Sequence, residues 1–97
     1  MDELDKIIKT LRRNKPVLKK QFKVKKLGIF GSYVRGRQKK NSDVDILVEF
    51  SRIPGFFKYL NMEDRLSNLL NKRVDLVMKG SLKPTIGKHI MREVVYV

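Results

Sequence analysis

Two aspartates, Asp43 and Asp45, open the apolar segment DVDILVEF. Aspartate is a poor strand former because its side chain competes with the backbone for hydrogen bonds. Since strand side chains alternate between faces, these two carboxylates are expected on one face, about 7 Å apart along the strand. Asp75 lies inside a second predicted strand, RVDLVM, and joins them if the two strands are neighbours. The pattern predicts a cluster of three carboxylates on one sheet.

A cluster of carboxylates needs neutralisation, because two unit charges 4 Å apart repel by about 4 kcal/mol at an effective dielectric constant of 20. A dense set of hard oxygen ligands suits Mg²⁺, with Mn²⁺ as an alternative. The competing interpretation is purely structural: Ser42-Asp43 is an ordinary turn and Asp45 is a strand residue that faces solvent. The residues upstream decide between the two.

Gly31 and Ser32 precede the aspartates by ten intervening residues. A glycine leaves room for a phosphate to approach backbone amides. Ser32 offers a hydroxyl and is expected to cap a short helix at about 33–37, where free N–H groups favour an anion. A Gly-Ser pair alone is ordinary turn chemistry. Together with the carboxylates, however, it predicts the two halves of a nucleoside triphosphate site.

Two other phosphate motifs are absent from the sequence. Gly31-x4-Gly36 begins like a P-loop, but Arg37-Gln38 follows where Lys-Ser/Thr is required. The sequence also has no G-x-G-x-x-G, so the dinucleotide-binding fingerprint is missing.

Hydrophobic periodicity predicts a single domain over residues 1–97 with alternating helices and strands. We expect the first helix to stop or kink at Asn14 and Pro16. Helices are predicted at about 2–14, 33–37, 57–71 and 85–91, and strands at about 24–30, 43–50, 73–78 and 94–97. The fold class is α+β (α/β): a small mixed sheet of about four strands with helices packed mainly on one face.

Two side-chain groups in the second half of the chain complete these predictions. The third helix should bury a face that includes residues 66, 69 and 70, with 60 and 62 nearby. Phe56 and Phe57 at its start are interpreted as packing side chains, and alternatively as lining a base pocket or a partner surface. The single histidine, His89, has no second ligand with which to hold a metal.

Composition limits the remaining possibilities. The formal net charge of +13 attracts polyanions such as nucleic acid, nucleoside triphosphates or an acidic protein, or else reflects a lysine-rich solvated surface. The absence of cysteine excludes disulfides and thiolate metal sites. No apolar stretch approaches the roughly 20 residues of a membrane span, and the acidic N-terminus lacks a signal region, so a cytoplasmic location without a membrane partner is expected.

The complete motif is Gly31-Ser32, ten intervening residues and then Asp43-Val44-Asp45, with Arg35-Gly36 and Ser42 between. It resembles the signature of the DNA polymerase β-like nucleotidyltransferase superfamily. The chain is most similar to the smallest members, the minimal nucleotidyltransferase (MNT) proteins. The downstream segments RVDLV, SLKP and MREVVYV fit the same group, so the likeness extends from about residue 25 to the end.

The resemblance implies a reaction and residue roles: transfer of a nucleoside monophosphate from a triphosphate, taken to be ATP, to an acceptor hydroxyl. Gly31 and Ser32 would hold the β- and γ-phosphates. Asp43 and Asp45 would hold two Mg²⁺ ions, and Asp75 would complete the site as metal ligand or general base. Arg35 would contact a phosphate or brace the aspartates, although an arginine here is also an ordinary surface residue.

The resemblance also implies a partner. MNT proteins act as antitoxins of HEPN-family ribonuclease toxins encoded beside them, by adenylylating a tyrosine and by binding the toxin. The expected activity is therefore that of a Mg²⁺-dependent protein adenylyltransferase. Two alternatives remain: an antitoxin that works by binding alone, and a basic nucleic-acid-binding module.

Overall fold

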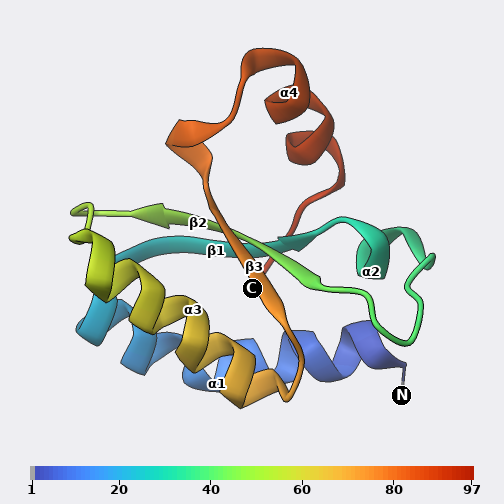
Figure 1. Cartoon of the computed structure of the whole chain (residues 1–97), viewed down its shortest axis with the longest axis horizontal. Coiled ribbons are helices and arrows are strands. Elements are labelled where there is room, and N and C mark those ends of the chain that lie inside the picture. Colours follow the sequence, from blue (N-terminus) through green and yellow to red (C-terminus); the bar gives the residue numbers. More distant parts are fainter. Residues whose placement is uncertain (1) are drawn as a thin grey trace.

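Helices and strands alternate along residues 2–97, the part of the chain described by this computed structural model (Figure 1). The order α-β-α-β-α-β-α-β expected from the sequence is confirmed. The elements are α1 (Glu3–Phe22), β1 (Val24–Phe30), α2 (Ser32–Arg35), β2 (Val44–Phe50), α3 (Phe56–Leu70), β3 (Val74–Met78), a 3₁₀ turn η1 (Lys79–Ser81), α4 (Pro84–Glu93) and β4 (Val95–Tyr96).

The four strands form one mixed sheet in the order β3-β2-β1-β4, which confirms the predicted fold class. β1 runs antiparallel to both β2 and β4. β2 and β3 are parallel, because the connecting helix α3 returns the chain to the end of the sheet at which β2 begins. β4 is short and pairs with β1 at only two positions, Gly28 with Tyr96 and Ile29 with Val95.

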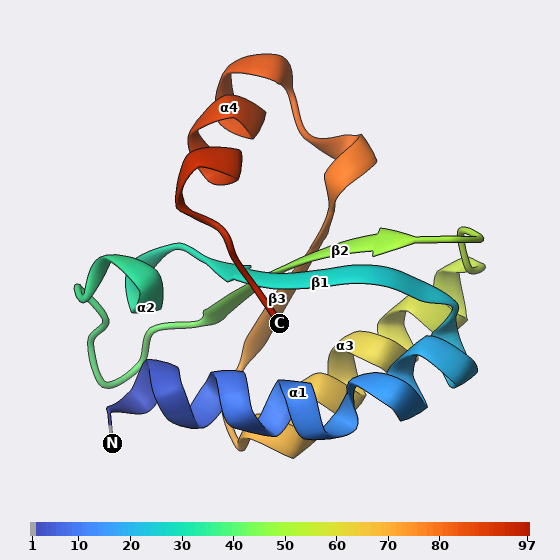
Figure 2. The same cartoon turned by 180° about the vertical axis from the view of Figure 1, so that it is seen from behind.

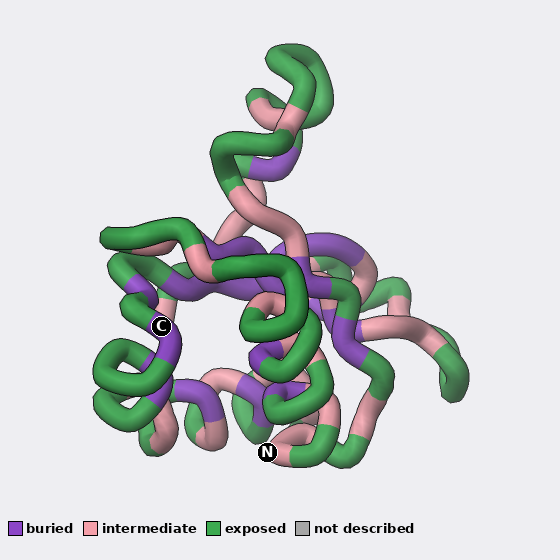
Figure 3. Tube along the Cα trace, turned by 60° about the vertical axis from the view of Figure 1, so that its left-hand side comes forward, coloured by how far each residue is buried: buried purple, intermediate pink, exposed green. Residues whose placement is uncertain are grey.

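The long helices α1 and α3 cover one face of the sheet, as predicted, while α4 stands on the opposite face (Figures 1 and 2). Val44, Ile46 and Val48 of β2 point into the main core. On the other face a smaller cluster forms where Ile90 of α4 packs against Phe30 and Leu47. Figure 3 shows buried residues concentrated along the strands, whereas α4 is mainly exposed. No helix among residues 2–97 combines the length and apolar character that crossing a bilayer requires.

The first helix is longer than predicted, since α1 continues through Pro16 to Phe22. Leu18 and Phe22 extend the buried stripe begun by Ile7 and Leu11, so tertiary packing outweighs the lost hydrogen bond at the proline. Pro16 itself is exposed.

The buried face of α3 also differs from the prediction. Met62 and Leu66, one helical turn apart, are fully buried, whereas Leu69 and Leu70 are half-buried and Leu60 is exposed. The fully buried face of α3 is therefore narrower than the number of leucines in its sequence suggests.

The expectation that Phe56 and Phe57 pack into the core is wrong, because they are 70% and 78% exposed. They begin α3 beyond the end of the sheet and contact each other edge to face, with ring centroids 5.6 Å apart. Tyr59 is the aromatic residue that packs inward, 6.2 Å from the ring of Phe50.

Candidate active site

The parallel register brings two of the predicted carboxylates together, because Asp45 of β2 and Asp75 of β3 are direct Cα partners. Along both strands the residues flanking each aspartate are buried. Alternation therefore turns both carboxylates to the α4 face of the sheet. The condition set by the sequence, that the two strands be neighbours, is met.

Asp43 lies two residues before Asp45, at the entrance to β2. The backbone N–H of Val44 donates to the carbonyl of Arg73 at 2.9 Å, which ties this entrance to the start of β3. The Oδ1 atom of Asp43 lies 3.9 Å from Nε of Arg73, an exposed contact that contributes little to stability.

The pKa of Asp45 shows that the carboxylates affect one another. The pKa of Asp45 is raised from 3.8 to about 6, mainly by burial and then by the negative charges of Asp75 and Asp43. The guanidinium of Arg35 lowers this pKa, and Glu93 raises it. The site therefore favours a bound proton or cation beside Asp45.

Gly31 forms the turn that lies directly against Asp45. Its φ of +82° is in the region that favours glycine. A Cβ at this position would overlap the Oδ2 atom of Asp45. Only a residue without a side chain lets the turn and the carboxylate come this close.

Ser32 differs in detail from the prediction, because it is the first residue of α2 while Gly31 occupies the capping position. The helix ends at Arg35, two residues earlier than expected, since Gly36 adopts a left-handed conformation with φ of +70°. Ser32 is half-buried, next to the turn that contacts Asp45.

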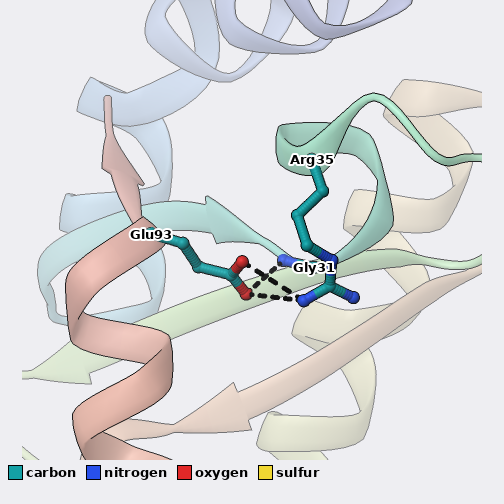
Figure 4. A network of polar contacts seen from close by, with 3 residues as sticks. All are labelled: Gly31, Arg35 and Glu93. Carbon is teal, nitrogen blue, oxygen red and sulfur yellow. Dashed lines mark hydrogen bonds and ion pairs between the residues drawn. The ribbon is translucent and has the colours of Figure 1, made fainter.

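Arg35 contacts Glu93, a residue to which the sequence analysis gave no role (Figure 4). Its Nη1 atom lies 3.2 Å from both carboxylate oxygens of Glu93. The same carboxylate accepts a hydrogen bond from the backbone N–H of Gly31 at 3.1 Å. Arg35 thus acts on Asp45 through its charge, while its hydrogen bonds go to Glu93.

Two open pockets flank the sheet at opposite ends. A polar pocket of about 510 Å³ borders Asp43 and is also lined by three basic side chains, Lys40, Lys72 and Arg73. A more apolar pocket of about 520 Å³ lies where β2 and β3 end, and none of the predicted site residues lines it. The polar pocket includes Asp43 of the candidate site in its lining and has the volume of a small-molecule binding site.

The acidic side chains of the site bear on whether it can hold a divalent cation. Within residues 2–97, no group of three or more acidic or histidine side chains is placed so that it could hold a metal ion, so Asp43, Asp45 and Asp75 do not form such a group here. Mg²⁺ commonly binds through one or two carboxylates, with substrate phosphates and waters completing its shell. Asp45 and Asp75 beside the Gly31 turn fit a site of that open kind.

Comparison with known proteins assigns the chain to a family. The nucleotidyltransferase domain family matches residues 4–97. Protein adenylyltransferase MntA of Thermococcus cleftensis is 52% identical over 94 residues, which cover 97% of this chain and 95% of the relative.

Solved structures agree with this assignment. A minimal nucleotidyltransferase superposes with a TM-score of 0.79 at 27% identity, covering 98% of this chain and 95% of that one. A chain of a toxin–antitoxin structure with AMP-PNP gives a TM-score of 0.70 at 30% identity, covering 99% and 72%. A chain from the tri-AMPylated Shewanella oneidensis HEPN toxin in complex with MNT antitoxin gives 0.61 at 26% identity, covering 97% and 67%.

The turn, the paired aspartates and these matches lead to one conclusion. The chain is a member of the nucleotidyltransferase domain family, in the group of minimal nucleotidyltransferases to which MntA belongs.

Proposed function

We propose that the protein is a Mg²⁺-dependent protein adenylyltransferase that transfers AMP from ATP to a hydroxyl of a HEPN-family ribonuclease toxin encoded nearby. A tyrosine is the expected acceptor, and the protein acts as the antitoxin. One observation carries the proposal: Asp45 and Asp75 lie side by side on neighbouring strands, and the Gly31 turn lies directly against Asp45.

Each residue of the site has a role in this proposal. Gly31 and Ser32 would form the turn that holds the β- and γ-phosphates, and Arg35 adds a positive charge beside it. Asp43, Asp45 and Asp75 would hold two Mg²⁺ ions. Magnesium bound there would supply charge neutralisation for the triphosphate and polarise the acceptor oxygen.

The reaction balances as a substitution at phosphorus. The acceptor oxygen forms a bond to the α-phosphorus, and the bond from that phosphorus to the bridging oxygen of pyrophosphate breaks. The hydroxyl proton passes to a general base; Asp75, which is exposed and stands beside Asp45, would serve in that role or as a metal ligand. Most of the rate enhancement would come from positioning and from electrostatic stabilisation of the transition state.

Similar proteins support this proposal through their own activity and ligands. A relative that matches nearly the whole chain is a protein adenylyltransferase. One structural neighbour contains an AMPylated HEPN toxin with its MNT antitoxin, and another contains AMP-PNP.

The decisive experiment is incubation of the full chain with α-labelled ATP, Mg²⁺ and the HEPN-family protein encoded by the neighbouring gene. Mass spectrometry should find AMP on the toxin, on a tyrosine. The double variant Asp43→Asn/Asp45→Asn should reduce labelling by roughly 10³-fold or more. A wild-type reaction that labels nothing would reject the proposal.

The same variant separates catalysis from simple binding. If Asp43→Asn/Asp45→Asn protects toxin-expressing cells as well as the wild type does, the protein is an antitoxin that works by contact alone.

The net charge of +13 favours a second candidate, a nucleic-acid-binding module. That function predicts RNA or DNA affinity that falls steeply with salt and does not depend on Mg²⁺ or ATP. A filter-binding titration at 50 and 200 mM NaCl, with and without ATP and Mg²⁺, distinguishes it from the adenylyltransferase.

A further inference from the structure

Glu93, the last residue of α4, links the phosphate turn to Arg35 (Figure 4). One carboxylate oxygen accepts from the Gly31 N–H at 3.1 Å, and both oxygens lie 3.2 Å from Nη1 of Arg35. The side chain of Glu93 is only 21% exposed, whereas that of Arg35 is 53% exposed. The Gly31 end of the contact is thus the better shielded from solvent, where charge-assisted hydrogen bonds are strongest.

Strand register explains why Glu93 reaches this turn. β4 pairs antiparallel with β1, and Ile29 lies opposite Val95. Extending this register two residues forward from Ile29 and two residues back from Val95 sets Gly31 opposite Glu93, where α4 ends. Gly28 permits this close approach, because a Cβ there would come within 2.6 Å of a side chain in the segment between α4 and β4. The sheet therefore brings the backbone of Glu93 close to the turn, and its side chain completes the contact.

We propose that Glu93 is a positioning residue for nucleotide binding. It fixes the amide of Gly31 and the guanidinium of Arg35 in place before the nucleotide binds. The turn then keeps its place against Asp45, and the charge of Arg35 stays beside that carboxylate. This inference rests on the proposed function and adds to it a residue outside the Gly-Ser and Asp-x-Asp motifs.

The hydrogen bond between Glu93 and Gly31 also gives the residues of the turn different roles. The N–H of Gly31 is already bonded to Glu93, so the direct phosphate contacts fall to Ser32 and Arg35. Gly31 contributes by having no side chain against Asp45. Without Glu93, an exposed arginine would have to lose its rotamer freedom when the nucleotide binds, which weakens binding.

An opposite effect is conceivable, since Glu93 is an anion near the expected triphosphate. If repulsion or competition dominated, removing the carboxylate would strengthen nucleotide binding. The two effects differ in sign, which makes affinity a decisive measurement.

The test is calorimetric titration of the full chain with a non-hydrolysable ATP analogue and Mg²⁺. Glu93→Ala should weaken binding about tenfold, the loss expected for one charge-assisted contact. Glu93→Gln keeps an oxygen for the Gly31 N–H and should restore part of that affinity. In an Arg35→Ala background the effect of Glu93→Ala should shrink, because part of it acts through that arginine.

Glu49→Gln is the matched control. Glu49 is also part-buried, with a side chain that is 29% exposed, and it pairs with Lys25 and Lys79 at 3.8 and 3.9 Å at the far end of β2. This variant should bind the analogue as the wild type does.

Three results would overturn the inference. The first is tighter binding by Glu93→Ala or Glu93→Gln. The second is a lower melting temperature for Glu93→Ala with unchanged affinity, which would make the contact structural only. The third is a wild-type chain that does not bind the nucleotide, which would reject the proposed function as well.

Discussion

Asp45 is the residue at the centre of the candidate site, and its carboxylate lies in an unfavourable electrostatic environment. Its pKa is raised to about 6, first by burial and then by Asp75 and Asp43. A carboxylate that is ionised at neutral pH in these surroundings lowers the stability of the folded state. Residues kept despite such a cost are typical of functional sites.

Asp45→Asn should therefore stabilise the metal-free protein at pH 7.5. We expect a gain of about 1 kcal/mol, a figure reduced because the carboxylate is only partly buried. Since the folded pKa lies above the unfolded value of 3.8, the native state loses stability as pH rises from about 4 to 6. The gain should thus be full above pH 6 and vanish near pH 4. Urea unfolding of both proteins in chelator checks this, and a variant that gains nothing at pH 7.5 would contradict it.

Gly31→Ala should disrupt the site, because it adds a positive-φ penalty and an overlap with Asp45. We expect a loss of about 2–3 kcal/mol in unfolding free energy, together with loss of toxin labelling. Gly36→Ala is the control, since φ there is also positive, at +70°, but no atom lies within 4 Å of the added Cβ. That variant should lose about 1 kcal/mol and keep its activity. Equal losses in both variants would show that the close approach to Asp45 is unimportant.

At the scale of elements, the site is assembled from the ends of separate segments. The parallel β2-β3 pair supplies Asp45 and Asp75, the β1-α2 turn supplies Gly31, and α4 supplies Glu93. The long helix α1 contributes no candidate residue, but it covers the opposite face and buries Leu11 and Leu18. The length of α1 determines how much of that sheet face it covers.

Pro16→Ala should stabilise α1. The proline lacks the N–H of a helix interior and is exposed, so alanine restores a hydrogen bond without a steric penalty. We expect a gain of about 1–2 kcal/mol, reduced from the full helix penalty by the extra freedom of the unfolded chain. Val17→Ala, at an adjacent exposed position, should change stability by less than about 0.5 kcal/mol. Thermal and urea unfolding measure both, and a destabilised Pro16→Ala would mean that the proline shapes the packing of α1.

At the scale of the whole molecule, the dominant feature is charge. The chain carries 23 basic and 10 acidic residues, giving a formal net charge of +13. The site itself concentrates carboxylates within this positive field. Such a field attracts anionic substrates and acidic partner surfaces, while self-repulsion opposes folding.

Raising NaCl from 20 to 200 mM should increase the melting temperature, because salt screens this self-repulsion. We expect about 5 °C, which corresponds to about 1 kcal/mol for a domain of this size. Replacing three exposed basic residues of α1 (Lys6→Gln, Lys9→Gln and Arg13→Gln) should reduce the increase. A melting temperature that is independent of salt in both proteins would show that the charges are already compensated locally.

The sequence by itself determined the order of the elements and the residues of the motif. Alternation predicted that Asp43 and Asp45 would share one face of a strand, and the Gly-Ser pair predicted a phosphate-binding turn at the end of the preceding strand. These properties are local, because they depend on side chains within a few residues of one another. The same local reasoning failed at Pro16, since it could not include the packing of Leu18 and Phe22 on the sheet.

Only the tertiary structure decided which distant segments meet. The β2-β3 register placed Asp75 beside Asp45, and the β1-β4 register placed Glu93 opposite Gly31. No local pattern specifies either pairing, because strand register is set by how whole faces bury their apolar side chains. For that reason no role was predicted for Glu93, although it lies in the segment MREVVYV and makes hydrogen bonds to both Gly31 and Arg35.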